Sequence, residues 1–145
     1  ARRHPADCVL SGFMQMFAPN VAMANFHTLE DAARYYRAVM ELWGQYRRAL
    51  PGMRVHEIRY EELVVDFDAV VNGLLEFLGL PWEDEVREFG ETALRRGRIT
   101  TPSRTQVTQP LYGHARYRWR RYRAHFGQAW EEIRPFMEAA GYPAE

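Results

Sequence analysis

The sequence predicts an α/β fold, because segments with helical periodicity flank a segment in which apolar and polar residues alternate. Residues 53–60, Met-Arg-Val-His-Glu-Ile-Arg-Tyr, show the alternation of a strand with one buried face. One strand cannot form a sheet, so further strands are expected upstream of residue 1. We therefore interpret residues 1–145 as the C-terminal, helix-rich part of a single larger α/β domain.

Several helices are predicted around this strand. Pro5 suits the first turn of a helix that continues to Phe17. Thr28, followed by Asp31, resembles a capping box, and apolar residues then recur at helical spacing until Pro51-Gly52. Other helices are expected over residues 67–78, closed by Gly79 and with a core-facing apolar stripe, over 83–96, and over 130–140. Residues 97–111, with two prolines and four threonines, predict a functional loop.

The composition restricts the function classes. With 145 residues, 47% of them hydrophobic, the chain can bury one sizeable core. Its 19 basic and 19 acidic residues balance, which disfavours nucleic acid and anionic membranes as partners. The same neutral net charge disfavours the alternative that the arginines of residues 116–123 bind single-stranded nucleic acid. A single cysteine and the lack of a membrane-spanning stretch favour a cytoplasmic location. The histidine and cysteine spacing predicts no metal site.

Two residue sets near the predicted strand are candidates for binding an anionic nucleotide. Arg3 and Ser11 lie at the start of a helix, where a guanidinium fork, a hydroxyl and the helix N-terminus suit a phosphate. Tyr60 lies at the exit of the strand, where an aromatic ring can pack against a nucleobase. Taken alone, these residues also fit a solvated arginine beside a helical serine and a half-buried tyrosine.

A third candidate set lies in the C-terminal third. Ser103, in the hydroxyl-rich loop, can donate to an oxyanion, and Arg118 in the following arginine-rich helix can balance its charge. The alternative is a solvated helix face, with Trp119 and Tyr122 turned inward.

Taken together, and in this order along the chain, the three sets resemble the sulfotransferases. The similarity includes the bacterial members that often carry tetratricopeptide repeats and the tyrosylprotein sulfotransferases. The Arg-x7-Ser run resembles the 3′-phosphate motif of this family. The segment Arg-Tyr-Glu-Glu-Leu-Val is similar to the family's Tyr-Glu-x-Leu element. The run Ser-x-x-Gln-Val, with a later pair of a basic residue and Trp, resembles the tyrosylprotein branch. The resemblance implies a P-loop-NTPase-like sulfotransferase fold whose N-terminal strands, phosphosulfate loop and general base lie upstream of this chain.

The resemblance also implies a reaction and its residues. The cosubstrate is 3′-phosphoadenosine 5′-phosphosulfate (PAPS), the product nucleotide is 3′-phosphoadenosine 5′-phosphate (PAP), and no metal takes part. The implied nucleotide contacts are Arg3 and Ser11 at the 3′-phosphate, Tyr60 near the adenine, and Ser103, the catalytic candidate, with Arg118 at the phosphosulfate. Arg116 and Arg120 are alternatives to Arg118.

Two further readings stay open at this point. The chain can instead be a non-catalytic fragment that binds nucleotide weakly or packs against a protein partner. An unpaired strand edge at residues 53–60 also favours self-association. The sequence does not name the acceptor, which in the family is a hydroxyl or an amine.

Overall fold

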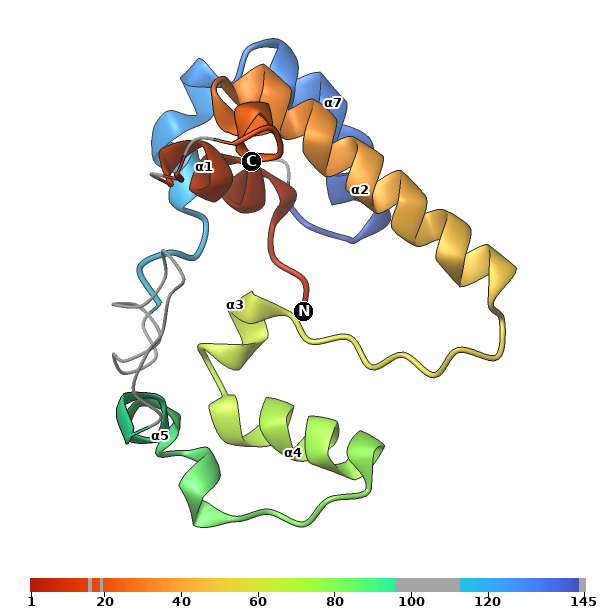
Figure 1. Cartoon of the computed structure of the whole chain (residues 1–145), viewed down its shortest axis with the longest axis vertical. Coiled ribbons are helices and arrows are strands. Elements are labelled where there is room, and N and C mark those ends of the chain that lie inside the picture. Colours follow the sequence, from red (N-terminus) through yellow and green to blue (C-terminus); the bar gives the residue numbers. More distant parts are fainter. Residues whose placement is uncertain (16, 19, 96–112, 144–145) are drawn as a thin grey trace. The chain divides into compact units, whose positions relative to one another are not determined.

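The computed structural model describes residues 1–15, 17–18, 20–95 and 113–143 and divides the chain into two compact units. Unit 1 contains residues 1–2 and 56–114, and unit 2 contains residues 3–55 and 115–145. Figure 1 shows the helices of each unit.

The described residues of unit 2 form three α-helices and two 3₁₀ helices. Helix α1 spans Pro5–Met14, α2 spans Leu29–Ala49 and α7 spans Gln128–Ala139, while the 3₁₀ helices η1 and η3 span Met23–Phe26 and Arg118–His125. Helix α2 lies along α7, and α1 packs against both (Figure 1). An ion pair between Arg37 Nη1 and Glu132 Oε2, at 2.5 Å, joins α2 to α7.

The core of unit 2 collects apolar side chains from α1, α2, η3 and α7. Each large side chain buried here stabilises the fold by about 1.5–3 kcal/mol relative to an exposed one. The buried residues of this cluster are Ala6, Val9, Leu10, Leu29, Ala32, Ala33, Trp119, Phe126, Ala129, Trp130, Ile133, Met137 and Tyr142.

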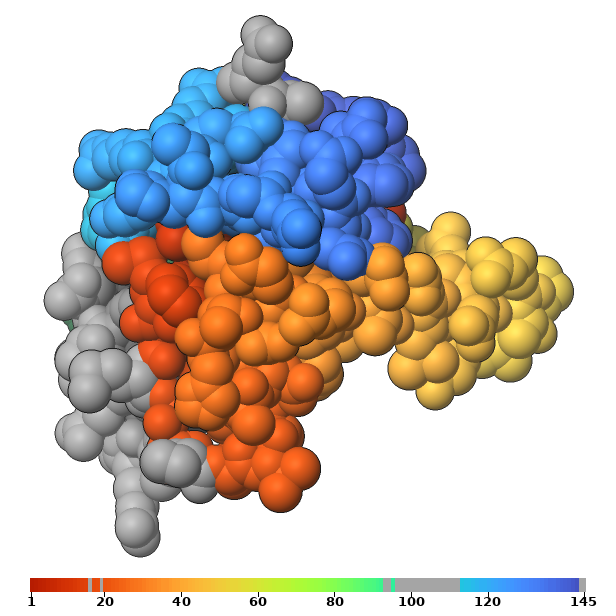
Figure 2. Space-filling view, turned by 90° about the horizontal axis from the view of Figure 1, so that it is seen from above, coloured from red at the N-terminus to blue at the C-terminus, as the bar shows by residue number. Residues whose placement is uncertain are grey.

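Helix α2 begins as the sequence predicts. The Thr28 side chain accepts a hydrogen bond from the backbone N–H of Asp31 at 3.0 Å, and its hydroxyl donates to the Asp31 carboxylate. Only residues of the first turns of α2, namely Leu29, Ala32 and Ala33, are buried. Figure 2 shows the C-terminal half of α2, in yellow, extending beyond the part that α7 covers.

The predicted strand at residues 53–60 is extended backbone that pairs at one point. In unit 1, the N–H of Arg2 donates to Ile58 O at 2.6 Å, and the N–H of Tyr60 donates to Arg2 O at 2.8 Å. These bonds form an isolated parallel bridge between Arg2 and Arg59, and the described residues contain no longer ladder. Among the described residues, only Arg2 pairs with the extended segment, so this segment forms no sheet. The regular secondary structure of the described part of the chain is therefore helical.

Helix α4 (Phe67–Leu78) of unit 1 has the bounds that the sequence predicts. Its first turn is capped by Asp66, whose Oδ1 accepts from the N–H of Ala69 at 3.1 Å, and Gly79 ends it in a left-handed conformation, with φ of 71°. The expectation of a buried apolar stripe is wrong in part: Val71 is buried, but Leu78 is 54% exposed. The reason is that few described elements of unit 1 cover this helix.

The predicted helix over residues 83–96 is divided. The 3₁₀ helix η2 (Asp84–Val86) is followed by α5 (Phe89–Arg95), and Arg96 lies outside the described residues. Between them, Arg87 donates to Asp68 of α4 at 3.0 and 2.5 Å, which fixes this turn against α4.

The predicted arginine-rich helix is the 3₁₀ helix η3. The chain enters it through Tyr117, which has a left-handed φ of 50°, and Trp119 and Phe126 point into the core. Arg120, Arg121 and Arg123 are exposed. The predicted loop over 97–111 lies outside the described residues.

Candidate functional site

Two hydrogen bonds join the start of α1 to the start of η3 within unit 2. Arg3 Nη2 donates to the carbonyl oxygen of Ala115 at 2.7 Å. The backbone N–H of Trp119 donates to Asp7 Oδ1 at 2.9 Å. The Arg-x7-Ser segment and the arginine-rich segment, which are more than 100 residues apart in the sequence, are therefore neighbours in the fold.

Asp7 is an unusual carboxylate because it is almost completely buried, with 1% of its surface exposed. Burial raises the pKa of this carboxyl above the ordinary 3.8, while the hydrogen bond from the Trp119 N–H and the positive charge of Arg3 oppose that rise. Its second oxygen, Oδ2, has no hydrogen-bond partner in the described part of the chain. The Trp119 N–H is thus the main polar anchor of this side chain.

His4 holds three segments of unit 2 together. Its Nδ1 accepts from the N–H of Ala6 at 3.2 Å and so caps α1, and its Nε2 lies 2.8 Å from the carbonyl oxygen of Pro143. These two contacts assign the proton to Nε2. The ring also stacks on Trp119, with centroids 4.8 Å apart and planes at 23°.

The ends of α1 differ in their access to solvent. The first turn is buried and contains the acidic residue Asp7, whose negative charge is favourable near the positive end of a helix. Ser11, two turns later, is exposed, and Arg3 is partly buried beside Ala115. The Ser11 hydroxyl is therefore exposed, whereas the N–H groups of the first turn lie in the interior and the Arg3 guanidinium donates to Ala115 O.

Arg118 lies in the same unit, at the first position of η3 and next to the buried Trp119. It is partly buried, and no described carboxylate forms an ion pair with it. Of the alternatives, Arg116 is also partly buried, while Arg120 is exposed and stacks over the ring of Tyr117 at 4.9 Å. Unit 2 therefore contains three of the predicted site residues: Arg3, Ser11 and Arg118.

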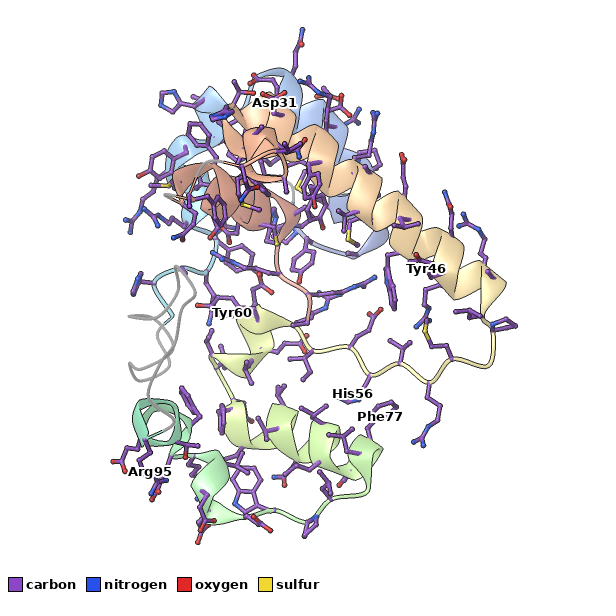
Figure 3. All side chains as sticks on the ribbon, viewed as in Figure 1. Asp31, Tyr46, His56, Tyr60, Phe77 and Arg95 are labelled. Carbon is purple, nitrogen blue, oxygen red and sulfur yellow. The ribbon has the colours of Figure 1, made fainter. Side chains whose placement is uncertain are left out.

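Tyr60 belongs to unit 1. It is the first residue of the short helix α3 (Tyr60–Leu63) and is partly buried, and Figure 3 shows it at the start of that helix. The neighbouring Glu61 is buried. Ser103 lies outside the described residues.

His56, interpreted from the sequence as structural, packs beside Phe77 with ring centroids 5.3 Å apart (Figure 3). No group of three or more His, Cys, Asp or Glu side chains that could hold a metal ion occurs among the residues that the structure describes. None of the described helices is both long and apolar enough to cross a membrane.

Sequence reasoning missed the structural roles of His4 and Asp7. The available signal was weak: Pro5 marks a helix start, so the residue before it is a cap position, and an acidic residue in the first turn is favourable there. Neither pattern shows that both side chains are buried against Trp119, because that contact joins segments more than 100 residues apart in the sequence.

Comparisons with known proteins agree with the motifs in this segment. A family model described as the sulfotransferase family matches residues 1–84. An uncharacterized protein of Aquifex aeolicus (strain VF5) is 33% identical over 129 residues, which cover 83% of this chain and 16% of that protein. The chain thus spans about one sixth of the length of this relative. No solved structure gives a significant match. Because the family model covers more than half of the chain, the chain belongs to the sulfotransferase family.

Proposed function

We propose that this chain forms part of a PAPS-dependent sulfotransferase and contributes half of the nucleotide site. The family match over residues 1–84 carries this proposal, because that range includes Arg3, Ser11 and Tyr60. The hydrogen bond from Arg3 to Ala115 supports it, since the bond draws the arginine-rich segment to the candidate phosphate site.

The proposed roles follow the chemistry of each side chain. Arg3 offers a planar fork of donors to the 3′-phosphate, and Ser11 adds a hydroxyl donor from the exposed side of α1. Tyr60 packs against the adenine. Ser103 and Arg118 stabilise the phosphosulfate, and the partial burial of Arg118 strengthens its interaction with an anion relative to a fully exposed arginine.

The proposed reaction is an in-line transfer of the sulfuryl group. The oxygen or nitrogen of an acceptor hydroxyl or amine forms a bond to sulfur, the bond between sulfur and the 5′-phosphate oxygen breaks, and PAP leaves. A base takes the acceptor proton, and we place that base outside this chain. Catalysis then rests on positioning and on charge stabilisation at the sulfuryl oxygens.

The same proposal includes the α/β fold. The isolated bridge between Arg2 and Arg59 is parallel, and parallel strands belong to sheets that are covered on both faces. Further strands from a longer polypeptide would complete such a sheet.

Calorimetric titration of the chain with PAP tests the proposal. Adenosine 5′-monophosphate, which has the same base and 5′-phosphate, is the control for the 3′-phosphate. We expect PAP to bind at least about tenfold more tightly, because a charge-assisted contact contributes roughly 1.5–3 kcal/mol. Equal affinities for the two nucleotides, with the chain shown to be folded by circular dichroism, would contradict the proposal.

A further inference from the structure

Residues 115–119 of unit 2 form a turn that is anchored at both of its ends to residues at the start of α1. At the first end, the carbonyl oxygen of Ala115 accepts from Arg3 Nη2 at 2.7 Å. At the second end, the backbone N–H of Trp119 donates to Asp7 Oδ1 at 2.9 Å. The residues between these anchors are therefore held in place relative to α1, beside which η3 lies in Figure 1.

Tyr117, in the middle of this turn, has a strained backbone conformation. Its φ of 50° and ψ of 28° lie in the left-handed region, and no other residue except glycine has such a positive φ in the described part of the chain. A residue with a side chain adopts this conformation at a cost in free energy, because its Cβ comes close to the following carbonyl oxygen. Glycine would adopt it without that cost, so the tyrosine must be held there by its surroundings.

The contacts of the Tyr117 ring help to hold this conformation. The ring meets the ring of His4 edge to face, with centroids 5.8 Å apart and planes at 76°. The guanidinium of Arg120 lies 4.9 Å from the centroid of the same ring. His4 is itself completely buried and stacks on Trp119, so it offers a fixed surface. The aromatic and cation–π contacts of the ring therefore offset the strain of the backbone.

The conformation of Tyr117 decides where the side chain of Arg118 leaves the backbone. Because peptide bonds are planar, the φ and ψ of one residue set the orientation of the next peptide and of the side chain that follows it. Arg118 comes directly after the left-handed residue and directly before the buried Trp119, and it is partly buried itself. Strained residues that a fold holds in place cluster at binding sites, where the strain positions a functional group.

We infer that Tyr117 is a positioning residue whose left-handed turn presents Arg118 to the 5′-phosphosulfate of the nucleotide. This inference rests on the proposed function, from which it takes the contact between Arg118 and the phosphosulfate. Tyr117 acts through Arg118 and not through a contact of its own with the nucleotide. The alternative is a purely structural turn that leads the chain into η3. A structural turn would affect the stability of the fold but would not distinguish one phosphate of the nucleotide from the other.

Two substitutions that both remove the ring separate the effect of the backbone conformation from that of the ring contacts. Asparagine tolerates the left-handed region, whereas valine, which is branched at Cβ, does not. Calorimetry measures the binding of Tyr117→Asn and Tyr117→Val to PAP, which has a 5′-phosphate, and to adenosine 3′-monophosphate, which lacks it. We expect the valine variant to bind PAP at least about tenfold more weakly than the asparagine variant, and adenosine 3′-monophosphate within about twofold of it.

A double-mutant cycle with Arg118→Ala identifies the side chain through which Tyr117 acts. In the Arg118→Ala background, the difference in PAP affinity between the valine and asparagine variants is expected to shrink to less than about twofold, because the side chain to be positioned is gone. A difference that stays undiminished would overturn the inference. Equal PAP affinities of Tyr117→Asn and Tyr117→Val would overturn it too, as would equal losses for both nucleotides.

The unaltered chain separates a failure of this inference from a failure of the proposed function. If it binds PAP no more tightly than adenosine 5′-monophosphate, the proposed function fails and this inference falls with it. If it prefers PAP but the two Tyr117 variants bind alike, only the positioning role is overturned. Circular dichroism confirms that each variant is folded. If Tyr117→Val does not fold, Tyr117→Ala replaces it, with PAP binding expected to be at least about threefold weaker than that of Tyr117→Asn, because alanine tolerates the left-handed region less well than asparagine.

Discussion

The carboxylate of Asp7 in the first turn of α1 accepts a hydrogen bond from the backbone N–H of Trp119 at the start of η3, at 2.9 Å. This contact joins the candidate phosphate-binding segment to the arginine-rich segment. It also fixes the position of Trp119, whose side chain is 1% exposed and stacks on His4. The geometry of the proposed nucleotide site in unit 2 therefore depends on one buried acidic side chain.

Removal of the Asp7 side chain is expected to destabilise unit 2. Asp7→Ala leaves the buried Trp119 N–H without its acceptor, which costs about 1–3 kcal/mol in the free energy of unfolding. Asp7→Asn retains an acceptor oxygen and is expected to cost less. Urea denaturation of both variants measures the difference, and equal losses would show that the hydrogen bond contributes nothing.

The pH dependence of stability provides a second test of Asp7. Because burial raises its pKa in the folded state, the folded chain binds this proton more tightly than the unfolded chain does. The stabilisation due to protonated Asp7 is complete below the ordinary pKa of 3.8 and is lost as pH rises through the folded value. The stability of the unaltered chain relative to Asp7→Asn is therefore expected to fall as the pH rises above 3.8. A relative stability that rises with pH above 3.8 would contradict the assignment.

The capping of α2 is expected to depend on the Thr28 hydroxyl. Thr28→Ala removes the acceptor for the N–H of Asp31 and is expected to lower the free energy of unfolding by about 1 kcal/mol. Thr28→Ser retains the hydroxyl and is the matched control, with little expected change. Thermal denaturation followed by circular dichroism compares them, and an alanine variant as stable as the serine variant would be inconsistent with this cap.

Gly79 is expected to be required for its backbone conformation rather than for space. It has a φ of 71°, and beyond its two chain neighbours no atom lies within 4 Å of the position that a Cβ would occupy. Gly79→Ala is thus expected to destabilise the chain by roughly 1 kcal/mol through left-handed strain alone. Gly52→Ala, also with open space but without a left-handed φ, is the control and is expected to be neutral or slightly stabilising. A neutral Gly79→Ala variant would indicate a different helix end.

The local parts of the fold are predictable from the sequence. The caps of α2 and α4 depend on Thr28, Asp66 and Gly79, whose effects act within a few residues, and the predicted ends of these helices agree with the structure. By contrast, the division of residues 83–96 into η2 and α5 involves the contact between Arg87 and Asp68, which lie on different elements. The helical propensity of residues 83–96 alone therefore cannot predict where this segment is divided.

The residue types of the candidate site can be predicted from the sequence, but the buried side chains that pack beneath it cannot. The Arg-x7-Ser spacing predicts Arg3 and Ser11, and the separate Arg-Tyr-Glu-Glu-Leu-Val element predicts Tyr60. The family match includes all three positions, and their roles stay predictions. The structural roles of His4 and Asp7 cannot be predicted from local patterns. Both side chains are buried against Trp119, and this contact forms only when the C-terminal segment packs against α1. Pairings over more than 100 residues have no local signature in a single sequence.

A double-mutant cycle between Arg3 and the 3′-phosphate tests the proposed site most directly. Calorimetry measures PAP and adenosine 5′-monophosphate binding to the unaltered chain and to Arg3→Ala, with Arg2→Ala as the control for a neighbouring arginine that pairs with Glu57. We predict that Arg3→Ala weakens PAP binding at least about tenfold and adenosine 5′-monophosphate binding less than about twofold, while Arg2→Ala changes neither. Equal losses for both nucleotides in folded Arg3→Ala would show that Arg3 does not bind the 3′-phosphate and would contradict the account.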